Sequence, residues 1–468
     1  MQNNDQNPAA SGGTALGDWI EARFPYRQFL RNQLTEYYAP RNFNFWYFFG
    51  SLALLVLVIQ IVTGIFLTMS YKPSADYAFA SVEYIMRDVE WGWLIRYMHS
   101  TGASLFFAVV YLHMFRGLMY GSYKKPRELL WIFGMLIYVV LMAEAFMGYL
   151  LPWGQMSYWG AQVIISLFGA VPGIGEPLAT WIRGDYLISD ITLNRFFALH
   201  VVALPLVLIG LVLFHLIALR TSGSNNPDGI EIKENKDENG VPKDGIPFHP
   251  YYTLKDLVAV GIFMAVFFFI VFYMPTFFGL FLKPANFEMA DHLQTPEHVP
   301  PVWYFTPFYA VLRAIPDTFG GVVAMTLSIV ILFFLPWIDR NPIKSWRYRS
   351  VLYKLLLLTF AGAFIVLGYV GIQPASTTID QIGWRMTQLY FLFFVVSWIY
   401  SYPRSKQYYL IAFAIVAAVI LVFDLWRGPD AFAWAMSIVP LGAAAIFLLL
   451  PTVTRLDESK PVPERLTS

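Results

Sequence analysis

The chain has 468 residues, of which 57% are hydrophobic, 18% aromatic and 13% charged, with a net charge of +1 and no cysteine. Soluble globular proteins carry about 25% charged residues, so this composition argues against a soluble enzyme and against a disordered chain. The small net charge argues against a nucleic-acid partner, and the lack of cysteine excludes disulfides, Cys-bound zinc, Cys-bound iron–sulfur clusters and thioether-attached haem.

Apolar segments recur along the chain, each near the length of about 20 residues that crosses a membrane. We therefore predict an all-α fold, a polytopic transmembrane bundle of eight core helices followed by a C-terminal extension of two helices. The first residues, 1–17, are polar and small, without the apolar stretch of a signal peptide. The predicted helices lie at 45–70, 96–120, 129–150, 194–219, 254–276, 319–338, 350–371, 382–401, 408–426 and 432–451.

Two of the connecting segments are long, and long ordered loops often carry function. The first contains an amphipathic stretch at 157–168 that is typical of a helix lying on the membrane surface, and the second, 277–318, is rich in proline and aromatic residues. The chain divides into a segment 1–44, a five-helix unit 45–276, a unit 277–401 formed by the second long loop and three helices, a hairpin 402–452 and a tail 453–468.

Positive charge predicts the orientation, because short cytoplasmic loops collect Lys and Arg. Lys and Arg gather before the first predicted helix, in every second loop and in the tail, whereas residues 372–381 contain none. With ten spans, both termini then lie in the cytoplasm. We expect a multi-pass protein of a bacterial inner membrane in contact with lipid.

Four of the seven histidines fall in two predicted helices that run in the same direction. His99 and His113 are fourteen residues apart, and His200 and His215 are fifteen apart. At 100° per residue, each pair returns to within about 40–60° of one direction and is separated by about 21–22 Å along the helix. The four side chains thus predict two facing pairs, one near each membrane surface, and two facing imidazoles suit a six-coordinate haem iron. A lone membrane histidine is more often a hydrogen-bonded packing residue, but four at matched depths favour two non-covalent b-type haems.

Glycines and arginines at related positions support this interpretation. Gly is common in membrane helices, but these glycines repeat at the histidine spacing and would leave room for two macrocycles. Two arginines, each three residues from a histidine, could pair with haem propionates, although Arg116 also suits positive-inside anchoring. The residues are Gly50 and Gly64, Gly134 and Gly148, Arg96 and Arg116.

Several motifs together resemble cytochrome b, the di-haem subunit of bacterial cytochrome bc quinol–cytochrome c oxidoreductases, over roughly 20–400. By this resemblance, His99 and His200 hold a low-potential haem, and His113 and His215 hold a high-potential haem. It also implies a Rieske-type iron–sulfur protein, a cytochrome c1-type subunit, a ubiquinone-like quinone and a homodimer. The motifs are RYMHSTGAS (96–104), YLHMFRGLMYGSY (111–123), GYLLPWGQMSYWGAQVI (148–164), LNRFFALH (193–200), SGSNNPDGI (222–230), FHPYYTLKDL (248–257) and PVWYFTPFYAVLRAIPDTFGG (301–321).

The resemblance further implies two quinone sites. The inner, quinone-reducing site would include Arg220, Lys255 and Asp256, although Lys255 and Asp256 also suit a solvated helix start. The outer, quinol-oxidising site would include Tyr149, the surface helix from Gly154 to Ile164, Pro301, Trp303 and Tyr304.

Three positions depart from the family pattern. Val302 stands where many relatives have a Glu that accepts a quinol proton, so we hypothesise that Glu297 substitutes for it, with His292 or His298 behind it. Arg220 stands where many relatives have His, and it stays protonated. The fifteen-residue histidine spacing replaces fourteen, and a kink at Pro205 would absorb the extra residue.

The expected function is a proton-translocating quinol oxidase core that passes one electron of quinol to an iron–sulfur partner. The other electron crosses the membrane through both haems to the inner quinone. A di-haem anchor of another quinone-linked oxidoreductase would share the histidines but would not need the long outer loop. A transporter would share polar midplane residues and broken helices, but would not need the matched histidines.

Overall fold

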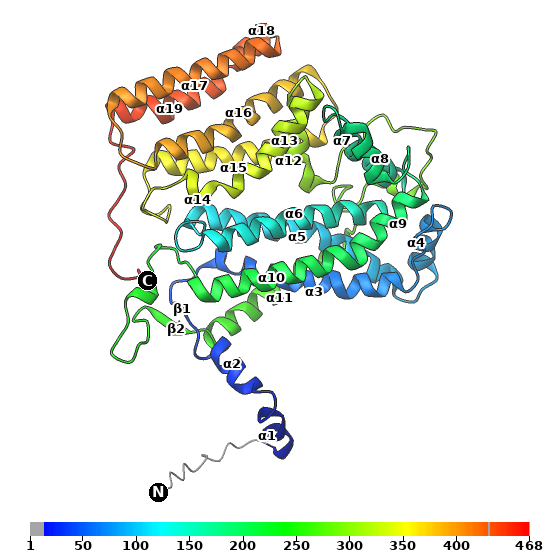
Figure 1. The fold of residues 1–468 in the computed structure, drawn as a ribbon, viewed down its shortest axis with the longest axis horizontal. Coiled ribbons are helices and arrows are strands. Elements are labelled where there is room, and N and C mark those ends of the chain that lie inside the picture. The colour runs from blue at the N-terminus through cyan, green and yellow to red at the C-terminus, as the bar shows by residue number, and fades with distance from the viewer. Residues whose placement is uncertain (1–13, 429–430, 468) are drawn as a thin grey trace.

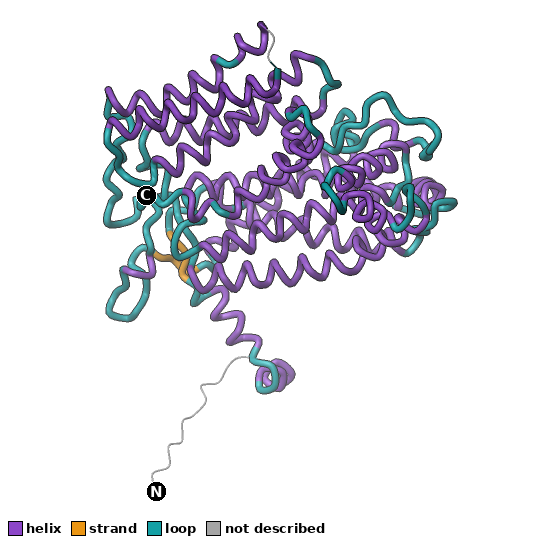
Figure 2. The backbone as a smooth tube through the Cα atoms, turned by 45° about the horizontal axis from the view of Figure 1, so that its top comes forward, coloured by secondary structure: helices purple, strands orange, loops and turns teal. Residues whose placement is uncertain are grey.

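The computed structural model describes residues 14–428 and 431–467, and these are mostly helical (Figures 1 and 2). The helices that form the body of the molecule are α3 (Phe49–Thr68), α4 (Ala78–Arg87), α5 (Gly92–Tyr120), α6 (Glu128–Leu150), α7 (Gln155–Gly169), α8 (Gly175–Arg183), α9 (Asp190–Ala198), α10 (Leu204–Ser222), α11 (Tyr251–Tyr273), α12 (Thr306–Ala314), α13 (Thr318–Phe333), α14 (Leu335–Ile338), α15 (Val351–Ile372), α16 (Thr377–Ile399), α17 (Lys406–Arg427), α18 (Ala431–Met436) and α19 (Ile438–Val453). Two short helices, α1 (Ala15–Glu21) and α2 (Tyr26–Leu34), precede them, and a π-helical turn, η2 (Leu199–Ala203), joins α9 to α10.

Nine helices in the described residues are long and apolar enough to cross a membrane. They match nine of the ten predicted spans, and the chain is an integral membrane protein. Serine side chains begin several of them: Ser350, Ser376 and Ser405 each accept a hydrogen bond from a backbone N–H three residues later. Such caps satisfy donors that the first helical turn leaves free.

The remaining predicted span, 319–338, is divided into the apolar helix α13 and the single turn α14. The division falls at Phe334, and Pro336 follows in the first turn of α14. Proline has no N–H to continue the hydrogen-bond ladder, so one helix ends and another begins there. The sequence therefore predicted the segment, but not the break.

Two opposite ends of the molecule differ in construction (Figure 1). At one end, strand β1 (Tyr38–Pro40) pairs antiparallel with β2 (Gly245–Pro247), and the C-terminus lies nearby. At the other end, α4, α7 and α8 cover the helix ends. The stretch 157–168, for which we predicted a helix on the membrane surface, is helical as α7. Figure 2 shows that the long helices run side by side between these two ends.

Two groups of helices meet along a shared apolar core. In the first group α3 packs against α5 and α6 against α10; in the second α12 packs against α15 and α16. The C-terminal hairpin of α17 and α19 packs against the outer side of α16. The first group positions the histidines.

Candidate functional site

The four membrane histidines form two facing pairs. α5 carries His99 and His113, while His200 lies in η2 and His215 in α10. The ring centroids of His99 and His200 are 6.2 Å apart, and those of His113 and His215 are 6.3 Å apart. The pairing predicted from the spacing is therefore present.

The π turn η2 accommodates the fifteen-residue spacing. Within it the N–H of Leu204 bonds to the carbonyl of Leu199, five residues earlier, instead of four. One residue more than an α-helical turn is thus taken up beside His200, immediately before Pro205. From the sequence we expected a kink at Pro205 to absorb the extra residue. In the structure the π turn η2, which carries His200, absorbs it.

Each of the four predicted glycines lies against one histidine ring. A Cβ built on Gly50 would lie 3.2 Å from His113 Cε1, and one on Gly64 would lie 3.4 Å from His99 Cε1. On α6, a Cβ on Gly134 would lie 3.3 Å from His215 Cε1, and one on Gly148 would overlap the His200 ring. The glycines therefore let α3 and α6 approach the histidine rings from behind.

Hydrogen bonds orient the two outer histidines. His99 Nδ1 lies 2.9 Å from Thr63 Oγ1, whose own proton is donated to the Ile59 carbonyl, so Nδ1–H is the donor in this contact. His200 Nδ1 lies 2.9 Å from the carbonyl oxygen of Glu144. With the proton on Nδ1 in both rings, each Nε2 keeps its lone pair for a metal ion.

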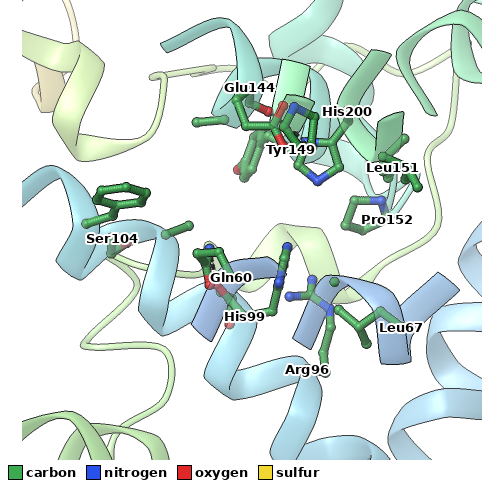
Figure 3. Close-up of a pocket in the computed structure, with 18 of the residues that line it drawn as sticks. Gln60, Leu67, Arg96, His99, Ser104, Glu144, Tyr149, Leu151, Pro152 and His200 are labelled. Carbon is green, nitrogen blue, oxygen red and sulfur yellow. Dashed lines mark hydrogen bonds and ion pairs between the residues drawn. The ribbon is translucent and has the colours of Figure 1, made fainter. Parts of the chain in front are cut away.

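A large cavity opens between His99 and His200 (Figure 3). The cavity has a volume of about 260 Å³. His99 and Arg96 lie on one side, while His200, Glu144 and Tyr149 lie on the other. The cavity therefore joins the outer histidine pair to the residues expected at the outer quinol site.

Only part of the predicted outer site reaches this cavity. Tyr149, Val302 and Tyr304 line it, and the Tyr149 hydroxyl is buried without a partner in the described structure. Tyr304 stacks on Phe107, with ring centroids 3.9 Å apart. The other five predicted residues are not among the lining residues: Gly154, Ile164, Glu297, Pro301 and Trp303.

Glu297 is not brought to the cavity. Its side chain is exposed on the loop, whereas Val302 is buried and lines the cavity. His298 Nε2 is 2.9 Å from the Ile372 carbonyl, and His292 packs near Tyr158. The described geometry gives no support to Glu297 as the substitute carboxylate.

Glu144 and Gln60 are cavity residues that the sequence reasoning missed. Glu144 Oε1 is 3.0 Å from His200 Nδ1, and Gln60 donates to the carbonyl of His99 at 3.0 Å. A carboxylate in the middle of an apolar span was the available signal, because ionisable groups inside membranes are functional candidates. It was not connected to His200 because only the fold brings α6 and η2 together.

Of the predicted inner-site residues, Asp256 contacts the segment behind His113, whereas Lys255 and Arg220 contact aromatic residues nearby in the fold. Asp256 accepts a hydrogen bond of 3.1 Å from Ser51, the neighbour of the glycine behind His113. Lys255 donates to the Tyr251 hydroxyl at 3.0 Å. Arg220 lies over the Tyr37 ring at 3.8 Å, and its Nη1 is buried without a partner among the described residues.

Arg116 lies three residues from His113 and, like Arg220, has its guanidinium over an aromatic ring. Its guanidinium lies 4.8 Å from the centre of the Tyr47 ring and donates to Ser122 at 3.0 Å. Its Nε is buried and has no partner in the described part of the chain. Arg96 reaches the outer cavity, so one arginine lies near each histidine pair.

The histidine pairs fit a haem iron. Two imidazoles that bind one ion from opposite sides with bonds of about 2.0 Å place their ring centroids about 6.3 Å apart. Both observed separations, 6.2 and 6.3 Å, agree with this value. Fold and site together thus define a helical membrane protein of the class that binds haem through paired histidines.

Comparison with known proteins identifies the family. Residues 34–223 match the family described as cytochrome b/b6/petB, and residues 289–392 match cytochrome b (C-terminal)/b6/petD. Cytochrome b of Allochromatium vinosum is 61% identical over 391 residues, covering 82% of this chain and 94% of that protein. Cytochrome b of Rhodospirillum rubrum is 50% identical over 378 residues, covering 81% and 90%.

A solved structure titled "Hyperthermophilic respiratory Complex III" is also similar, with a TM-score of 0.77 and 42% identity, covering 82% of this chain and 98% of that one. The chain belongs to the cytochrome b family. It is a core subunit of a complex III-like oxidoreductase, and family membership implies haem b as its cofactor.

Proposed function

We propose that this chain is the two-haem core of a quinol–cytochrome c oxidoreductase that oxidises quinol at an outer site and reduces quinone at an inner site. The proposal rests mainly on the two facing histidine pairs, which lie at different levels of the helix bundle. The outer pair lies beside a cavity that is also lined by Tyr149 and Tyr304. When bound, the two haems supply a route for single electrons across the membrane.

The four histidines would hold these haems without covalent attachment. His99 and His200 form the outer, low-potential site, and His113 and His215 form the inner, high-potential site. Gly50, Gly64, Gly134 and Gly148 support the rings, and Arg96 and Arg116 are placed to bind propionates.

The outer cavity would bind quinol. Its walls combine apolar side chains with the unpartnered Tyr149 hydroxyl, which suits a ring with polar oxygens at its ends. One electron of the quinol would pass to a Rieske-type iron–sulfur protein and the other toward the inner site. The protons would leave on the outer side.

The inner site would bind the quinone that is reduced. Asp256 and Lys255 would supply protons, and Arg220 would bind a quinone oxygen or a propionate as a permanent cation. Because protons are taken up inside and released outside, the reaction would build a proton gradient. A ubiquinone-like substrate and cytoplasmic termini in a bacterial inner membrane complete the proposal.

Partner subunits are required, because a chain without cysteine cannot hold an iron–sulfur cluster or a thioether-bound haem. One relative, from Bradyrhizobium diazoefficiens, is named cytochrome b/c1, and 46% of residues are identical over the matched region. We propose a Rieske-type protein, a cytochrome c1-type subunit and a second copy of this chain as partners.

Activity of the intact complex tests the proposal. Steady-state electron transfer from quinol to cytochrome c should fall at least about tenfold in Tyr149→Ala, equivalent to about 1.4 kcal/mol of transition-state stabilisation. Glu297→Gln is the matched control on the exposed loop and should retain activity. Full activity in Tyr149→Ala would contradict the proposed outer site, and complete lack of quinol oxidation in the unmodified complex would contradict the function.

A further inference from the structure

Glu144 contacts the outer histidine pair in a way that no residue contacts the inner pair within the described structure. His200 Nδ1 lies 2.9 Å from the Glu144 carbonyl oxygen and 3.0 Å from its carboxylate oxygen Oε1. Both oxygens belong to one residue, which sits one helical turn before Gly148, and the carbonyl oxygen is the hydrogen-bond acceptor. The glycine lets α6 lie against the His200 ring, so the contact is built into the packing of α6 on η2.

The carboxylate is enclosed rather than solvated. The Glu144 side chain is 16% exposed, and its second oxygen, Oε2, is buried without a hydrogen-bond partner among the described residues. It lines the same cavity as His99 and Arg96. A carboxylate in such surroundings acts more strongly on its neighbours than one in water, because screening is weaker.

No carboxylate contacts either histidine of the inner pair in the described residues. Nδ1 of His113 is buried without a partner in the described residues, and His215 faces the Leu130 main chain, which lies one turn before Gly134 as Glu144 lies one turn before Gly148. At the outer pair, by contrast, His99 is bonded to Thr63 and His200 to Glu144. The two sites therefore differ in the carboxylate, which among the described residues lies beside a histidine Nδ1 only at the outer pair.

We propose that Glu144 is a positioning residue that lowers the reduction potential of the outer haem site relative to the inner one. The Nδ1–H of His200 is donated to the Glu144 carbonyl, and the carboxylate oxygen 3.0 Å away places a negative charge beside the same imidazole. That charge would favour the ferric over the ferrous state of a bound haem iron. Electron transfer from the outer to the inner site is then downhill. This inference rests on the proposed haem ligation by the two histidine pairs.

Redox titration of the purified complex at fixed pH, followed by the separate absorbances of the two haems, tests the inference. Glu144→Gln keeps the size and an acceptor oxygen but removes the carboxylate. It should favour reduction of the outer haem at least tenfold, which corresponds to about 59 mV for a one-electron couple. The inner haem serves as the internal reference and should not shift. Glu144→Asp, which restores a carboxylate, should return part of the difference.

Glu128→Gln is the matched control, because it makes the same chemical change in the first turn of the same helix. It should leave the outer haem at its original potential. An unchanged outer potential in Glu144→Gln, an equal shift of both haems, or loss of the outer haem from that variant would overturn the tuning role. Two b haems in the unmodified complex would support the proposed function under any of these outcomes, whereas their absence would contradict that function separately.

Discussion

Gly148 and Gly64 each lie against one of the two outer histidines, but only Gly64 has room for a Cβ atom. A Cβ at Gly148 would overlap the His200 ring, whereas one at Gly64 would lie 3.4 Å from His99, an ordinary contact distance. Gly148→Ala should therefore displace His200 and remove most of the outer haem, while the matched variant Gly64→Ala should retain it. Reduced-minus-oxidised spectra measure both. Equal haem content in the two variants would contradict the supporting role of Gly148.

At the level of single residues, the sequence predicted the histidine and glycine positions, because these follow from helical periodicity. Histidines and glycines repeated at nearly one interval, and the structure brings each glycine to one histidine. It could not connect Glu144 or Thr63 to a histidine, because these contacts depend on which helices are neighbours. Glu297 was chosen for its chemistry and closeness in sequence, but its loop directs it away from the cavity.

The π turn η2 makes a prediction at the level of one element. It contains the one residue that lengthens the histidine spacing to fifteen, and Val202 within it is 56% exposed. Deleting Val202 should convert the turn to ordinary α-helix and keep both haems. Deleting Leu213, also 56% exposed but in regular helix, should rotate His215 by about 100° and remove the inner haem. Loss of the inner haem from the Val202 deletion would contradict this account.

The C-terminal hairpin is fastened to α16 by a buried polar cluster. Arg385 is ion-paired with Asp424, which also accepts hydrogen bonds of 2.6 Å from Trp384 and from Ser437. Removing one partner leaves a buried charge, so Arg385→Ala should destabilise the chain by about 3–5 kcal/mol, and Arg385→Met with Asp424→Leu should cost less. Thermal unfolding in detergent measures both, and an equal or greater loss in the double variant would contradict the pairing.

Nine of the ten predicted spans are present as single apolar segments in the described residues, because length and hydropathy alone define them. Breaks inside spans were not predictable, since Pro336 divides α13 from α14 while Pro205 is accommodated within a continuous run from Asp190 to Ser222. The same residue type thus has different outcomes, which the sequence pattern alone does not distinguish.

For the whole molecule, the C-terminal tail joins segments that are distant in sequence. Arg465 bonds to Asp244 at 2.7 Å, and Thr467 bonds to Asp228 at 2.8 Å. The hydrogen bond from Arg465 holds the pKa of Asp244 below its usual value of 3.8. Because the folded pKa is lowered, the contact stabilises the docked tail above that usual pKa and is lost as the pH falls through the folded value.

Hydrogen exchange across residues 454–467 tests this contact. At pH 7, Asp244→Asn should raise exchange by up to about fivefold, because a partly exposed ion pair contributes about 0–1 kcal/mol. Arg455→Ala, whose own ion pair with Glu458 is exposed, is the control and should not change it. Once the pH falls below the lowered pKa of folded Asp244, the variant and the unmodified chain should exchange alike. A difference that persists there would contradict the assignment.

The central claim is that two histidine pairs each hold one haem at different depths. The most direct measurement is the number of b haems per chain, by reduced-minus-oxidised spectra of the purified protein and of two single variants. The account predicts two haems in the unmodified chain, loss of one in His200→Leu and loss of the other, spectrally distinct haem in His113→Leu. Two haems retained in either variant, or the same haem lost from both, would contradict it.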